Sequence, residues 1–186
     1  MADSAAGAHP GAVIRFWFDE LEPAHWWRKD AGLDQQIRQR FGALHAAASA
    51  GELWPWRDSA EGRLAEVIVL DQFSRNLYRD DARAYAQDAL ALVLAQEAVR
   101  GGCDQALPPV QRNFLYMPYM HSESLPIHDQ ALRLFDQPGL ENNLDFERRH
   151  RELIVRFGRY PHRNAVLGRR STEQERAYLS QPGAGF

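Results

Sequence analysis

The sequence has few of the residues that disulfide-stabilised folds, metal sites and membrane spans require. It holds one cysteine, Cys103, which excludes an internal disulfide and a cysteine-rich zinc site. The longest unbroken apolar run, residues 89–95, is far too short to cross a membrane. The first ten residues contain neither a basic stretch nor an apolar stretch, so nothing there marks the chain for export. We therefore expect a soluble cytoplasmic protein, with no metal site and no cofactor.

Lysine is also scarce, since Lys29 is the sole lysine and arginine supplies the other basic side chains. The net charge is −3, yet residues 148–170 hold eight arginines and a single acid, so that segment is +7 and the remainder is −10. The planar guanidinium suits bidentate pairing with carboxylates or phosphates better than an ammonium group does. A coding bias toward arginine would explain the missing lysines but not this clustering.

The apolar pattern predicts an all-α protein. The chain of 186 residues has the length of one domain. Apolar residues recur at intervals of three and four, as at Leu33, Ile37 and Phe41, whereas sustained two-residue alternation is absent, so a sheet is unexpected. Helices are expected at residues 13–18, 33–48, 63–78, 83–100, 109–118, 124–136, 140–159 and 172–180, with Pro118 kinking or ending the fifth of them.

The domain organisation follows from these helices. We expect a flexible tail over residues 1–12 and one helical domain over residues 13–181. Consecutive antiparallel helices with short links indicate stacked helix pairs, as in tetratricopeptide proteins. No clean 34-residue repeat is visible, so any repeats have diverged, and an irregular helical bundle is the alternative.

The end of the helix expected over 63–78 is the first candidate for a functional surface. At 100° per residue one arc is apolar at Leu64 and Ile68, and then becomes polar. The polar residues of that arc are Asp71, Gln72, Arg75, Asn76 and Arg79. Such a face either lines a cleft or emerges into solvent with an Asp71–Arg75 pair that contributes little to stability.

The turn after Pro118 is the second candidate, because it carries His121 and Glu123. These side chains could perform acid–base chemistry. Together with His128 they could also ligate a metal, but their spacing matches no metal motif. The structural alternative is that Glu123 pairs with an arginine and His121 bonds to the backbone.

The third candidate is the loop that follows the helix expected over 140–159. Gly158 turns the chain and Pro161 stiffens it. Polar side chains lie before and along this loop at Arg156, Arg159, His162, Arg163 and Asn164. Held on a stiff loop, they could bind an anion at a small entropic cost. The alternative is a network that ties the loop to neighbouring helix ends.

Several sequence blocks resemble one known family. They are Phe16-Trp-Phe18, Trp26-Trp27, the runs over residues 70–79, 114–123 and 156–164, Leu167-Gly-Arg169 and Ser171-Thr172. These are similar to the signature blocks of a largely bacterial family, domain of unknown function 924, and the resemblance extends from about Val13 to Leu179. It implies an all-helical, tetratricopeptide-like single domain and implies no activity. One departure is Ser124, where the family pattern has an acid.

Two functional hypotheses follow for these candidates. In the first, they converge on an arginine-lined pocket that binds an anionic small molecule or an acidic peptide. Its ligand-binding residues would be Asp71, Arg75, Asn76, Arg79, Arg156, Arg159, Arg163 and Asn164, with Glu123 holding an arginine in position. In the second, a hydrolase-type enzyme uses His121 and Glu123 as acid and base on an anionic substrate, with His162 as a further candidate.

A third hypothesis is binding of nucleic acid or an acidic partner through residues 148–170. The overall negative charge and the scarcity of lysine argue against nucleic acid. The sequence does not indicate an oligomeric state.

Overall fold

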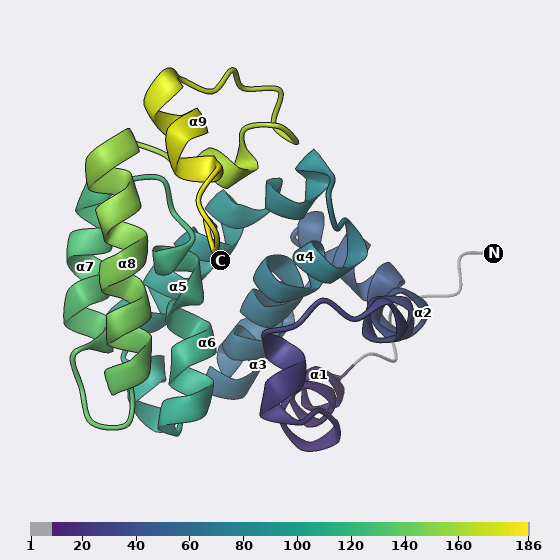
Figure 1. Ribbon diagram of the computed structural model, residues 1–186. Helices are drawn as coiled ribbons and strands as arrows, with labels where there is room; N and C mark the ends of the chain where they lie inside the picture. Colours follow the sequence, from purple (N-terminus) through teal and green to yellow (C-terminus); the bar gives the residue numbers. More distant parts are fainter. Residues whose placement is uncertain (1–8, 186) are drawn as a thin grey trace.

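The computed structural model describes residues 9–185, and within that range it is entirely helical, with no strand (Figure 1). The prediction of a single all-α domain is therefore confirmed. The α-helices are α1 (Pro10–Arg15), α2 (Ala31–Ser49), α3 (Ala60–Ile68), α4 (Ser74–Leu77), α5 (Asp88–Arg100), α6 (Pro109–Met120), α7 (Leu125–Phe135), α8 (Glu141–Phe157) and α9 (Glu173–Leu179). Two π-helical turns, Phe16–Glu20 and Val69–Phe73, extend α1 and α3.

Several predicted boundaries differ from the structure. Helix α1 begins at Pro10, so residues 10–12 are helical and not part of a tail, while residues 1–8 of that expected tail lie outside the described residues. The helix expected from residue 83 begins at Asp88, after a separate 3₁₀ turn over Ala82–Tyr85. Of the two outcomes expected for Pro118, a kink or a helix end, the second does not occur, because α6 continues to Met120.

An aromatic cluster joins the two π-helical turns to α6. Trp17 contacts both Phe73 and Phe114 edge to face, each with ring centroids 5.6 Å apart. Phe16 also lies edge to face with Phe73, at 6.1 Å. These rings are buried, and each such pair adds about 0.5–1.5 kcal/mol beyond the burial of apolar area. The cluster therefore fixes the turn at Val69–Phe73 against α6.

Helices α5 to α8 pack in chain order. Helix α5 contacts α6, α6 contacts α7, and α7 contacts α8, so these helices lie side by side on one side of the molecule (Figure 1). This order agrees with stacked helix pairs, although the tetratricopeptide-like assignment stays a prediction. None of the described helices is long and apolar enough to cross a membrane.

Candidate functional site

The π-helical turn at Val69–Phe73 directs two adjacent polar side chains at α6. Asp71 is wholly buried, and its Oδ1 lies 2.7 Å from Nδ1 of His121. Gln72 donates to Asp71 Oδ2 at 2.7 Å and lies 3.7 Å from Met117 Sδ. Met117 and His121 are one turn apart at the end of α6, so the π-helical turn docks onto a single face of that helix.

Charge and burial set the protonation states of this pair. Burial of Asp71 favours its neutral form, but the charges and hydrogen bonds of its neighbours outweigh burial and lower its pKa. The pKa of His121 is also lowered, because burial and the positive charge of Arg75 oppose a second positive charge. At neutral pH His121 is thus a neutral imidazole whose Nδ1–H donates to Asp71. Its Nε2 makes no hydrogen bond to any described residue.

Arg75 links this pair to α5. Its guanidinium donates to both carboxylate oxygens of Asp88, at 2.9 and 3.1 Å, and to the Asp71 carbonyl oxygen at 2.9 Å. Its Nη1 is also 3.5 Å from Asp71 Oδ1, so the expected Asp71–Arg75 pair is present. One guanidinium therefore lies between two carboxylates.

Arg163 is the least well paired arginine of this region. Its side chain is 7% exposed, and its closest acidic contact is Nη1 to Asp88 Oδ2 at 3.4 Å, on the carboxylate that Arg75 already binds. The buried Nε has no hydrogen-bond partner. The guanidinium instead lies 4.6 Å from the ring centroids of Tyr85 and of Tyr160. Burial and repulsion by Arg75 lower the pKa of Arg163, and the nearby carboxylates of Asp88 and Glu123 do not fully offset this.

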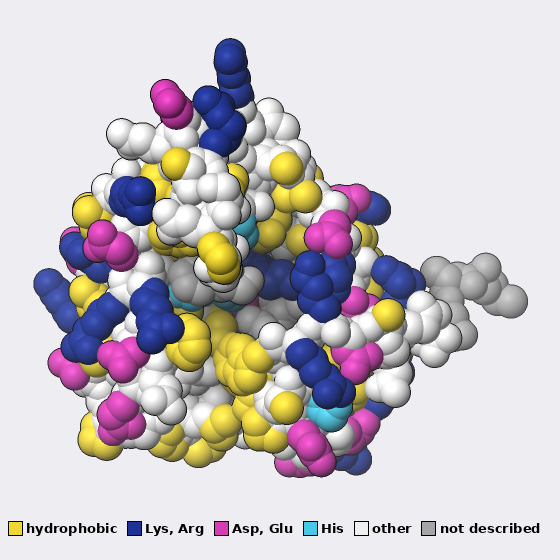
Figure 2. Space-filling view, in the orientation of Figure 1, with side chains coloured by type: hydrophobic (Ala, Val, Ile, Leu, Met, Phe, Trp, Pro, Cys, Tyr) yellow, Lys and Arg dark blue, Asp and Glu magenta, His cyan; other side chains and the backbone are white. Residues whose placement is uncertain are grey.

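His162 lies at the edge of the same group. Burial and the positive charge of Arg163 lower its pKa to about 4, and it is within electrostatic range of His121. A Cβ built on Gly185 would lie 3.5 Å from His162 Cβ, so the segment after α9 packs on this ring. That segment returns to the middle of the molecule (Figure 1), where Figure 2 shows a hollow with apolar side chains below and basic side chains beside it.

We refer to this group as the central cluster, which comprises Asp71, Arg75, Asp88, His121, His162 and Arg163. It draws residues from the π-helical turn, α4, α5, the end of α6 and the 3₁₀ turn at Pro161–Arg163. Its formal charges balance, because two arginines face two carboxylates and the histidines are neutral at pH 7.

Glu123 has a structural role beside the central cluster. It accepts hydrogen bonds from the Tyr160 backbone N–H at 2.7 Å and from both terminal nitrogens of Arg169, at 2.6 and 2.9 Å. Burial alone would raise its pKa, but these bonds lower it. Arg169 also donates to Asn164 Oδ1 at 3.0 Å. Glu123 does hold an arginine in position, and it is poorly placed to exchange a proton.

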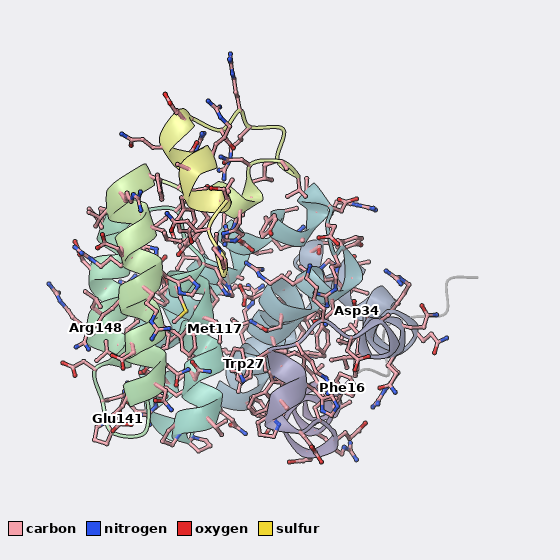
Figure 3. The ribbon with its side chains drawn as sticks, viewed as in Figure 1. Phe16, Trp27, Asp34, Met117, Glu141 and Arg148 are labelled. Carbon is pink, nitrogen blue, oxygen red and sulfur yellow. The ribbon has the colours of Figure 1, made fainter. Side chains whose placement is uncertain are left out.

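Other predicted site residues point away from the central cluster. Asn76 and Arg79 both donate to the Asp34 carboxylate of α2, at 2.7–2.8 Å, on the side of the molecule where Figure 3 labels Asp34, apart from Met117. The regular 100° spacing fails here because the π-helical turn alters it and because α4 ends at Leu77, before Arg79.

Two further predicted arginines, Arg156 and Arg159, also lie elsewhere. Arg159 forms a bidentate pair with Glu175 of α9, at 2.7 and 2.9 Å. Arg156 is exposed, with its guanidinium 4.7 Å from the Phe157 ring centroid. The structure thus brings together Asp71, Arg75, His121, His162 and Arg163, and of the predicted arginines only two belong to the central cluster.

Asp88 and Tyr85 are the residues that sequence reasoning missed. Both fell inside the helix expected over 83–100, where neither had a distinguishing feature. The available signal was an acidic residue in the first turn of a helix, a position that favours a negative charge.

The charges of the +7 segment are largely neutralised by acids outside it. Its ion pairs are Arg148–Asp145, Arg151–Asp129, Arg159–Glu175, Arg163–Asp88 and Arg169–Glu123. Among the described residues no group of three or more histidines, cysteines and acids could hold a metal ion. A separate surface cavity of about 320 Å³ lies at the start of α9, lined by Arg170, Ser171, Thr172, Glu173 and Arg176.

Comparisons with known proteins agree with this fold. The family described as "Bacterial protein of unknown function (DUF924)" matches residues 13–183. A solved structure of a protein of unknown function from Agrobacterium tumefaciens, ATU0120, shares 40% sequence identity, with a TM-score of 0.88 over 92% of this chain and 96% of that one. No curated protein matches. The chain therefore belongs to the bacterial DUF924 family.

Proposed function

We propose that the central cluster binds a small anionic molecule, with Arg163 as the group that pairs with its negative charge. The observation that carries this proposal is the incomplete pairing of Arg163, a guanidinium that is almost wholly buried yet shares its closest carboxylate with Arg75 and leaves Nε without a hydrogen bond. A buried donor without a partner is costly, and the oxygens of a carboxylate or phosphate supplied by a ligand would accept hydrogen bonds from it.

The proposal is narrower than the arginine-lined pocket expected from the sequence. Arg79 and Arg159 are each satisfied by an acid of the chain itself, so they support structure and not binding. A single incompletely paired guanidinium suits one carboxylate or phosphate group better than a run of acidic side chains. We therefore favour a small molecule over an acidic peptide.

Calorimetric titration with acetate, butyrate, citrate, phosphate and an acidic peptide tests this proposal. We expect at least one small anion to bind, and Arg163→Gln to weaken it by about 10–100-fold, the usual value of a charge-assisted hydrogen bond. The exposed Arg156→Gln is the matched control and should bind as the unmodified chain does. Binding that survives Arg163→Gln, or binding of the peptide alone, would contradict the proposal.

A second candidate function is hydrolysis of an anionic ester, and the Asp71–His121 contact favours it. Asp71 holds Nδ1–H, which leaves Nε2 as the proton acceptor. Nε2 would take a proton from a water molecule whose oxygen bonds to the acyl carbon, and the departing alcohol would take that proton as its C–O bond breaks. In this second function Asp71 is the carboxylate that acts with His121, in place of Glu123, which the sequence had suggested.

Nitrophenyl esters and phosphate esters are the probes for this second function. Turnover by the unmodified chain that disappears in His121→Asn would support it, because asparagine can keep the hydrogen bond to Asp71 but has no counterpart of Nε2. Absence of turnover across both ester classes would reject it.

We also propose that the protein is cytoplasmic and that its stacked helices form a tetratricopeptide-like groove.

A further inference from the structure

The central cluster contains a hydrogen-bond acceptor as well as an underpaired cation. His121 is locked as the tautomer that carries its proton on Nδ1, because Nδ1 lies 2.7 Å from a buried carboxylate that both Arg75 and Gln72 support. Its Nε2 therefore presents a lone pair. The side chain is 14% exposed, so a ligand can approach this atom, and no described residue bonds to it.

A continuous chain of contacts connects the two ligand-facing groups. Nη1 of Arg75 lies within 3.5 Å of a carboxylate oxygen on each of Asp71 and Asp88. Asp71 holds His121, and Asp88 contacts Arg163, so a single guanidinium and its two carboxylates span the distance between them. A ligand that bonds to both groups must bridge this row of side chains, so the distance between its two polar groups is the variable to test.

The neighbours of His121 keep Nε2 an acceptor. The charged and titratable groups that act on its imidazole are Asp71, Arg75, Asp88, His150 and His162. Burial and Arg75 oppose protonation more strongly than the two carboxylates favour it. At neutral pH Nε2 therefore accepts a hydrogen bond from a ligand hydroxyl group and does not donate one.

We propose that the anion bound at Arg163 is a short hydroxy acid, whose carboxylate pairs with Arg163 and whose hydroxyl group donates to Nε2 of His121. This inference rests on the proposed anion site and specifies its ligand class. A carboxylate alone would satisfy Arg163 but leave Nε2 unpaired, and an alcohol alone would leave Arg163 without a further hydrogen-bond acceptor. The two unsatisfied groups of the central cluster are complementary to the two polar groups of a hydroxy acid.

The experiment compares each hydroxy acid with its deoxy parent by calorimetric titration. Lactate is paired with propionate, and 3-hydroxybutyrate and 4-hydroxybutyrate are each paired with butyrate, which also tests the spacing. We expect at least one hydroxy acid to bind about tenfold more tightly than its parent at neutral pH, as one hydrogen bond to a neutral acceptor provides. His121→Asn should abolish this preference and keep binding of the parent acid, while His121→Gln, which can place an amide oxygen near Nε2, should restore part of it.

Controls separate this inference from the anion site itself. Arg163→Gln should weaken hydroxy acid and parent equally, and the exposed His9→Ala should change neither. If hydroxy acids and parents bind alike, the hydroxy-acid inference is overturned while the anion site stands. If none of these acids binds, both are overturned. The preference should also disappear in the unmodified chain as acid protonates His121, which provides a test even if the variants fail to fold.

Discussion

Two single substitutions in the central cluster should change stability in different ways. Asp88→Asn removes the carboxylate that Arg75 binds through two hydrogen bonds and that Arg163 contacts at 3.4 Å. Arg163→Met removes the underpaired charge but keeps an unbranched apolar side chain between Tyr85 and Tyr160. The contrast between these variants isolates the pairing of Arg163.

The magnitudes follow from burial. Loss of one partner from a buried ion pair costs about 3–5 kcal/mol, and the side chains of Asp88 and Arg75 are 18% and 22% exposed. We therefore expect Asp88→Asn to lower the free energy of unfolding by about 2–4 kcal/mol. Arg163→Met should change it by less than about 1 kcal/mol in either direction, since the lost charge was poorly compensated.

Urea unfolding at neutral pH, monitored by circular dichroism, measures both effects, provided that the m-values agree. The double variant should be more stable than Asp88→Asn alone, because removing Arg163 relieves its repulsion with Arg75. The reasoning is refuted if Arg163→Met is as destabilising as Asp88→Asn, which would make Arg163 an ordinary structural ion pair.

Three further predictions concern titration, packing and the segment after α9. Burial lowers the pKa of His150 to about 3 from its ordinary value of 6.5. Between pH 6.5 and 3, His150 is therefore protonated in the unfolded chain but neutral in the folded one, and the free energy of unfolding falls as the pH is lowered. In urea titrations at several pH values, His150→Phe should reduce that slope by about 1.4 kcal/mol per pH unit, and an unchanged slope would contradict the burial of His150. A Cβ on Gly62 would lie 1.9 Å from a backbone oxygen, so Gly62→Ala should lower the melting temperature sharply. Gly42 lies in the middle of α2, and a Cβ there would meet nothing within 4 Å, so Gly42→Ala should raise the free energy of unfolding by about 0.5–1 kcal/mol. Equal effects would be inconsistent with this packing. Removing residues 181–186 should raise the pKa of His162 toward its ordinary value in an NMR titration, because Gly185 covers that ring, and no change would show that the segment lies elsewhere.

The sequence was sufficient to predict the helical class because three- and four-residue spacing directly reports which side of a helix is buried. Local signals also predicted a helix start, since both hydrogen bonds of the Thr172–Glu175 capping box are present at the start of α9. Helix interruptions were harder to predict. Nothing local distinguishes Val69–Phe73 from an α-helix, and its π-helical form is associated with aromatic packing against Trp17, which is distant in the sequence.

The candidate site was predicted in part for the same reason. The residue types of Asp71, Arg75, His121 and Arg163 marked them as chemically capable, and they do meet. Which acid each arginine binds depends on long-range pairing, as when Arg79 reaches Asp34 and Arg159 reaches Glu175. Sequence spacing carries no information about such pairs, so the expected pocket contained arginines that the fold uses elsewhere.

Locating a bound anion tests the central claim most directly. A crystal structure of the protein with selenate, collected at the selenium absorption edge, would show where the anion lies. We predict an anomalous peak within hydrogen-bonding distance of the Arg163 guanidinium, on the side facing His121, and its loss in Arg163→Gln. A peak confined to the cavity beside Arg170 and Arg176, with none at Arg163, would contradict the proposed site.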